Sequence, residues 1–186
     1  MINEKEGLNV NKTIKISLLG AIAVVLMYFD FPILPMFPWL KIDLSDVPAL
    51  MGAFAFGPMS GVIIEVLKNL LILIVKGTST VFIGELANIL IGIALVVPPA
   101  YIYRKNKSRK NAFLGMIAGF IGVQLVGIIA NVYLLIPAFG MQMDKGETLK
   151  YVTVGLLPFN GVKAILVFLV TYILYKKVSR IIFKDE

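Results

Sequence analysis

The sequence contains no cysteine and no histidine, and few of its residues are charged. Without cysteine the chain forms no disulfide and offers no thiolate nucleophile. Without histidine it lacks the commonest general base and most zinc and iron ligands. Of its 186 residues 16% are charged and 59% are apolar, whereas an average soluble domain has roughly 25% and about 45–50%. This excess of apolar residues excludes a soluble globular fold, and we expect an integral membrane protein.

Six apolar stretches are candidates for membrane helices, and a full span needs about 20 apolar residues. Four stretches are long enough, at 16–34, 81–103, 112–139 and 152–175. The stretches 47–56 and 61–75 are shorter and are separated by Gly57-Pro58, because proline interrupts a helix. The stretch 47–56 is either a span or a re-entrant segment. The sequence predicts an all-α protein with six transmembrane helices in one membrane domain, residues 1–186.

Basic residues are concentrated in three polar segments. Twelve of the eighteen Lys and Arg residues lie in the tail 1–15, the loop 104–111 and the tail 176–186. Six helices place all three on one side, and cytoplasmic loops are rich in Lys and Arg. We therefore expect both termini in the cytoplasm, and the loop 35–46 outside the cell. The basic clusters fit contacts with anionic headgroups, and no stacking aromatics or known module indicate nucleic acid.

Polar side chains inside apolar stretches are the candidates for a binding site, because a charge near the bilayer centre costs at least ~2.5–3.5 kcal/mol. At 1.5 Å per residue, Glu85 lies roughly 6 Å below its outer helix end, Asn131 and Asn160 about 12 Å, and Lys163 about 16 Å. We interpret these four as a small-molecule pocket open to the outside. The alternative is that the amides bridge helices without a ligand. Glu65 and Lys68, spaced i, i+3, are expected to form a structural pair.

No catalytic pattern is present in the sequence. We find no metal-ligand spacing, no nucleophile beside a base and no phosphate-binding glycine loop. We therefore expect no enzyme activity, no cofactor and no metal, and no ATP hydrolysis by the chain itself.

One block of sequence resembles a known family. Residues 37–71, FPWLKIDLSDVPALMGAFAFGPMSGVIIEVLKNLL, contain F-P-x-L-K-x-D-x-S-D-x-P-A-L, then G-P-x-x-G-V and K-N. This block resembles the riboflavin-specific substrate-binding subunit (S component) of energy-coupling-factor (ECF) vitamin transporters of the bacterial plasma membrane. The later segments GEL-N, IANVY and PFNGVKA are compatible with the same family along nearly the whole chain.

The resemblance implies a function and a site. Such a subunit binds riboflavin outside the cell and delivers it inward with a transmembrane coupling protein and a pair of cytoplasmic ATPases; flavin mononucleotide is a second candidate ligand. The loop 35–46 would cover the pocket, with Asp43 and Leu44 close to the ligand. Asn131, Asn160 and Lys163 would bind the flavin ring and Glu85 the ribityl hydroxyls, or the reverse.

The first helix departs from the family pattern. S components carry A-x-x-x-A there for docking to the coupling protein, whereas this chain has Ser17 and Ala21 at that spacing, with Gly20 beside them. Small residues allow close helix approach, so we expect either a docking surface or packing within the subunit.

Two functional alternatives remain open at this point. The chain could be an S component for another vitamin. It could also be a self-sufficient proton-coupled carrier, with Glu85 or Glu65 as the proton site.

Overall fold

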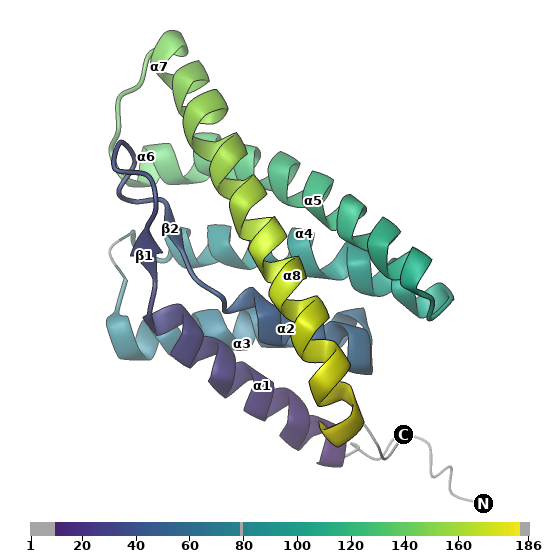
Figure 1. Ribbon diagram of the computed structural model, residues 1–186. Helices are drawn as coiled ribbons and strands as arrows, with labels where there is room; N and C mark the ends of the chain where they lie inside the picture. The colour runs from purple at the N-terminus through teal and green to yellow at the C-terminus, as the bar shows by residue number, and fades with distance from the viewer. Residues whose placement is uncertain (1–9, 79, 183–186) are drawn as a thin grey trace, which may run out of the picture.

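The protein is a bundle of helices with one small hairpin, described in a computed structural model for residues 10–78 and 80–182, with side chains up to Tyr175 (Figure 1). The elements are α1 (Val10–Tyr28), β1 (Phe31–Pro32), β2 (Lys41–Ile42), α2 (Asp46–Phe56), α3 (Pro58–Lys76), α4 (Ile83–Lys105), α5 (Arg109–Ala130), η1 (Asn131–Leu135), α6 (Ile136–Ala138), α7 (Lys145–Lys150), η2 (Tyr151–Leu156) and α8 (Leu157–Ile182).

Five helical segments are long and apolar enough to cross a membrane: Val10–Tyr28, Pro58–Lys76, Ile83–Lys105, Arg109–Ala138 and Lys145–Tyr175. The sixth helix, α2, has 11 residues and is about 16 Å long, roughly half of the ~30 Å hydrocarbon core. It contacts α1, α3, α4 and α8, and most of its side chains are buried. The predicted six helices are therefore present, and α2 is a short helix inside the bundle.

The segment between α1 and α2 departs from the helix expected to continue to residue 34. Helix α1 ends at Tyr28, and β1 pairs antiparallel with β2, Phe31 opposite Ile42. Three prolines, at positions 32, 35 and 38, break any helix here. Residues 29–45 form the irregular strap that carries both strands and lies near α6 and α7 at one end of the bundle (Figure 1). We call it the 29–45 segment; it contains most of the loop 35–46.

The three basic segments are shorter than expected where the structure describes them. Helix α1 begins at Val10, so part of the expected tail 1–15 is helical, and residues 1–9 lie outside the described residues. Helices α4 and α5 leave only residues 106–108 between them, and α8 continues through Ile182 into the expected tail 176–186. Lys and Arg side chains at helix ends reach the membrane surface without a long loop.

Two of the long helices change to a wider π-helical form near the 29–45 segment. The π-helical segments are η1, at the end of α5, and η2, before α8. Such segments are frequent at functional sites, because the change in winding re-aims the side chains. Asn131 and Tyr151 are their first residues.

Candidate functional site

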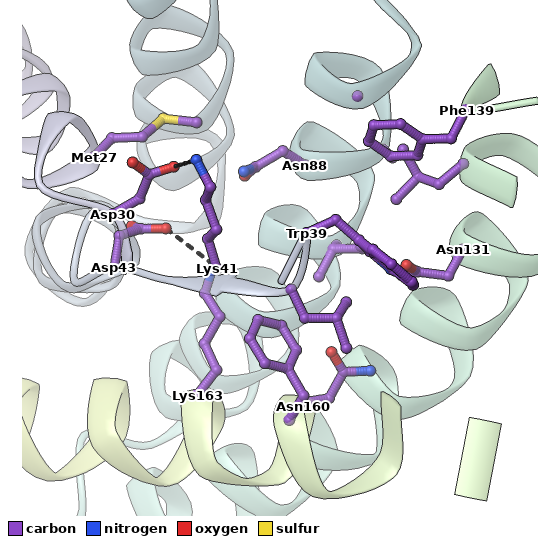
Figure 2. Close-up of a pocket in the computed structure, with 16 residues that line it drawn as sticks. Met27, Asp30, Trp39, Lys41, Asp43, Asn88, Asn131, Phe139, Asn160 and Lys163 are labelled. Atoms are coloured by element: carbon purple, nitrogen blue, oxygen red, sulfur yellow. Dashed lines mark ion pairs between the residues drawn. The ribbon is translucent and has the colours of Figure 1, made fainter. Parts of the chain in front are cut away.

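A cavity of about 210 Å³ lies beneath the 29–45 segment, between α1, α4, the α5–η1 junction and α8 (Figure 2). Its polar wall comprises Asp30, Trp39, Lys41, Asp43, Asn88, Asn131, Asn160 and Lys163. Phe139 and Phe159 are among the apolar residues that line it. A largely apolar cavity with a few convergent polar groups is the usual form of a small-molecule site.

Lys163 connects the 29–45 segment to the helices. Its Nζ lies 3.5 Å from Asp43 Oδ2 and 3.0 Å from Asp46 Oδ2, and its side chain is nearly buried. Figure 2 shows Lys163 extending from α8 toward the segment that carries Asp43, with the ion pair dashed. A buried ammonium needs such partners, so α8 holds the end of the segment by charge.

Asn160, one helical turn before Lys163, has hydrogen-bonding capacity to spare. Its side chain is 2% exposed, and within the described residues its Nδ2 has no hydrogen-bond partner. A Cβ on Gly127 would lie 2.5 Å from that Nδ2, so glycine on α5 allows the close approach of the amide. A buried donor without a partner is costly, and a ligand acceptor in the cavity would satisfy it.

Asn131 is held by a chain of hydrogen bonds that starts in the 29–45 segment. Trp39 Nε1 donates to Tyr151 Oη at 3.1 Å, and Tyr151 Oη donates to Asn131 Oδ1 at 2.8 Å. Asn131 Nδ2 in turn donates to the Gly127 carbonyl at 2.8 Å. This chain fixes the orientation of the amide and leaves one Nδ2 hydrogen and one Oδ1 lone pair for a ligand.

Tyr151 is a site residue that the sequence reasoning missed. Tyr151, Gly155, Phe159 and Lys163 recur every four residues, which is the spacing of one helix face. Phe37 of the 29–45 segment packs against this face, with its ring centroid 5.2 Å from that of Tyr151. The four-residue spacing from Lys163 was the signal that could have found Tyr151.

Four of the six expected ligand residues, Asp43, Asn131, Asn160 and Lys163, line this one cavity. Glu85 instead lines a neighbouring cavity with Lys76 and Thr78, and its Oε2 accepts a hydrogen bond from Thr78 Oγ1 at 3.1 Å. Leu44 packs against the apolar core instead of lining the cavity.

The small residues on α1 point in two directions. Ser17 and Ala21 are exposed on the outside of the bundle, as a docking surface requires. Gly20 is buried, and a Cβ there would lie 2.6 Å from Leu67 Cδ2 of α3. Gly20 therefore serves packing within the subunit.

A second group of polar residues lies behind the cavity wall and touches it where Asp46 pairs with Lys163. The expected pair of Glu65 and Lys68 is confirmed, with 2.8 Å between Oε2 and Nζ. Lys68 also pairs with Asp46, and its Nζ donates to Ser45 Oγ at 2.9 Å. None of these four residues is among those that line the cavity. We call Asp46, Glu65 and Lys68 the sealed cluster, and Asn131, Asn160 and Lys163 the cavity cluster.

The fold and the site together define a multi-pass membrane protein with a small-molecule cavity at one end of its helix bundle. The model of the family "ECF transporter, substrate-specific component" matches residues 11–175. The chain therefore belongs to this family. It is a non-enzymatic subunit of a bacterial transporter, and its family implies that it works with the partner module of an ECF transporter.

Individual relatives agree with the family assignment. The chain is 36% identical to riboflavin transporter RibU of Staphylococcus aureus (strain TCH60), over 96% of this chain and 97% of that protein. It is 31% identical to riboflavin transporter FmnP of Bacillus subtilis (strain 168), over 92% and 94%. A solved S component of a bacterial ECF transporter superposes with a TM-score of 0.82 at 34% identity, covering 96% of this chain and 100% of that one.

Proposed function

We propose that this chain captures riboflavin outside the cell and, within an ECF transporter, delivers it to the cytoplasm. The observation that carries the proposal is that Asn160, whose buried Nδ2 has no hydrogen-bond partner among the described residues, lines the cavity beneath the 29–45 segment together with Asn131 and Lys163. The names of the full-length relatives support riboflavin as the ligand.

The cavity chemistry suits a flavin. The ring system of riboflavin carries carbonyl oxygens and ring nitrogens along one edge, which match the donors of Asn160 and Lys163 and the remaining capacity of Asn131. Phe159 and Trp39 supply apolar area for the ring. Flavin mononucleotide shares the ring and the ribityl chain, and Lys41 and Lys76 near the neighbouring cavity would face its phosphate. The Asp43 carboxylate and the Glu85 carboxylate are the candidate acceptors for ribityl hydroxyls.

The 29–45 segment acts as a lid in this proposal. At about 210 Å³ the cavity is smaller than the ~300–1,000 Å³ usual for ligand sites, so the segment has to move outward to admit a flavin. Beside the cavity it is tied to the helices by the Asp43–Lys163 ion pair and the Trp39–Tyr151 hydrogen bond. Further contacts, the Asp30–Lys76 ion pair, the Lys68–Ser45 hydrogen bond and the packing of Phe37 on Tyr151, would have to loosen as well or act as the hinge.

Orientation and partners follow from charge and surface. The Lys and Arg residues at the α4–α5 turn, residues 104–110, support a cytoplasmic location for that end of the bundle, and for both termini. The 29–45 segment then faces outward.

We propose that the exposed Ser17 and Ala21 of α1 contact a transmembrane coupling protein, which works with two cytoplasmic ATPases. Ala21→Trp should leave ligand binding intact and reduce co-purification with the coupling protein; unchanged co-purification would reject this surface.

Tryptophan fluorescence tests the ligand directly, since Trp39 is the only tryptophan in the chain. Riboflavin added to the purified, ligand-depleted protein should quench it saturably at submicromolar concentration, because Trp39 lines the cavity proposed for the flavin. Thiamine serves as the control ligand. Quenching by thiamine and not by riboflavin would indicate another vitamin. Transport by the chain in liposomes without ATPases would indicate a self-sufficient carrier.

A further inference from the structure

A second cavity lies far from the cavity cluster. Its volume is about 460 Å³, and it lies between α2, the α4–α5 turn and α8. The α4–α5 turn is at the end of the bundle away from β1 and β2 (Figure 1). The ligand proposed above uses none of the residues that line this second cavity.

The inner wall of this second cavity is aromatic and apolar. Phe54 of α2 packs edge-on against Tyr103 of α4 and Tyr175 of α8, with ring centroids 5.1 and 5.8 Å apart. Met116 and Ala112 of α5 form the side of the cavity. Thr171 of α8 is the polar exception, because its buried Oγ1 has no hydrogen-bond partner among the described residues. The aromatic and aliphatic remainder of the wall suits a hydrocarbon chain.

The rim of the second cavity is strongly basic. Lys107 and Arg109 line it, and Arg104, Lys105 and Lys110 lie next to them in the sequence. Within the described residues, none of these five cations forms an ion pair with a carboxylate. The solvent-accessible carboxylates within the described residues lie at the other end of the bundle; they are Asp30, Glu85, Asp144 and Glu147. The rim therefore carries positive charge that an outside anion can balance.

The exposed aromatic residues place this rim at a membrane surface. Tyr101, Phe113 and Tyr172 have 57%, 65% and 57% of their surface exposed. Tyrosine side chains such as Tyr101 and Tyr172 gather at the level of the lipid headgroups, because their rings are amphipathic. Basic pockets between membrane helices at that level suit phosphate headgroups.

We propose that this second cavity binds one anionic diacyl phospholipid. An acyl chain lies along Phe54, Met116 and Ala112, and the headgroup phosphate meets Lys107 and Arg109 at the start of α5. That helix start adds the partial positive charge of its free amide groups. The site is independent of which vitamin the subunit carries.

Native mass spectrometry of the full chain from detergent micelles tests the proposal. Dioleoyl phosphatidylglycerol should remain bound in preference to dioleoyl phosphatidylcholine, which has the same chains. The double variant Lys107→Gln with Arg109→Gln should lose this preference, because its affinity for the anionic lipid should fall by about fivefold for each charge removed. The matched control, Lys145→Gln with Lys150→Gln, removes two exposed lysines at the opposite end and should retain the preference.

A second pair of variants tests the acyl chain separately from the phosphate. Ala112→Trp fills the cavity and should reduce lipid binding, although Lys107 and Arg109 are unchanged in this variant. Ile117→Trp, on the exposed face of α5, is its control, and equal thermal midpoints show that both variants are folded. Glycerol phosphate, the headgroup without chains, should not displace the lipid.

Three results would overturn the proposal. One is equal retention of the two lipids, and another is a preference that survives the loss of Lys107 and Arg109. The third is a combination of two observations. The wild-type protein retains neither lipid, and the double variant co-purifies less well with the coupling protein than the wild type does. That third result would identify the surface as a protein-docking site.

Discussion

The cavity cluster and the sealed cluster contain similar numbers of polar residues inside a membrane protein. They differ in their hydrogen-bond and ion-pair partners and in whether they line a cavity. In the sealed cluster Lys68 has Asp46, Glu65 and Ser45 as partners, although Glu65 Oε1 lacks a hydrogen-bond partner among the described residues. In the cavity cluster the Nδ2 of Asn160 likewise has no hydrogen-bond partner there, and Asn160, unlike Glu65, lines the cavity. Polar residues in a membrane span therefore do not by themselves mark a ligand site. Spare hydrogen-bonding capacity beside a cavity does.

Breaking the sealed cluster should have the largest effect, and the effect should be on stability. Lys68→Met leaves Glu65 without its cation and Asp46 with Lys163 alone, which should cost about 3–5 kcal/mol. SDS-induced unfolding in mixed micelles, followed by circular dichroism, measures the free energy of unfolding. Lys41→Met is the control, because its ion pair with Asp30 is partly exposed and should contribute less than about 1 kcal/mol. Similar losses in both variants would contradict the distinction between the clusters.

Removing the amide of Asn160 from the cavity cluster should reduce binding and leave stability nearly unchanged. Asn160→Ala should weaken riboflavin affinity at least tenfold, because a bound acceptor loses its partner at about 1–3 kcal/mol. Fluorescence titration measures the affinity. Gln124→Ala is the matched amide control, since Gln124 bridges α5 to the Leu157 carbonyl of α8 at 3.0 Å and does not line the cavity. Unchanged affinity in Asn160→Ala would remove this residue from the site.

Removing one hydroxyl should have a smaller effect, on the rate of ligand release. Tyr151→Phe deletes the group that accepts from Trp39 and donates to Asn131. The loss of about 0.5–1.5 kcal/mol should speed dissociation two- to tenfold in stopped-flow fluorescence, with little change in association. Tyr133→Phe, at a residue that is 73% exposed in η1, is the control. Slower association instead would indicate that Tyr151 acts during entry.

The smallest effect is expected at Glu85. Its carboxylate lines the neighbouring cavity and bonds to Thr78, so Glu85→Gln should weaken riboflavin binding by less than about threefold. The same titration measures it. A tenfold loss would show that the two cavities join when the ligand binds and would restore Glu85 as a principal contact.

The sequence predicted more of the site than of the loops around it. Depth along the expected helices selected Glu85, Asn131, Asn160 and Lys163, because helix rise is constant, and the last three of these line one cavity in the structure. The partners of Lys68 were only half predicted. Glu65 is local, at i, i+3, whereas Asp46 comes from α2 and pairs only because the helices pack together. The π-helical turns that begin at Asn131 and Tyr151 gave no signal in residue spacing.

By itself the sequence determined that this protein lies in a membrane, how many helices it has and which residues are polar at depth. These properties follow from composition and from the fixed geometry of a helix. The tertiary structure decided which of these polar groups have hydrogen-bond partners within the protein. Gly127 brings α5 close to Asn160, and Tyr151 bonds both to Trp39, 112 residues earlier in the chain, and to Asn131. Such contacts depend on how the helices pack, and local sequence does not encode that packing.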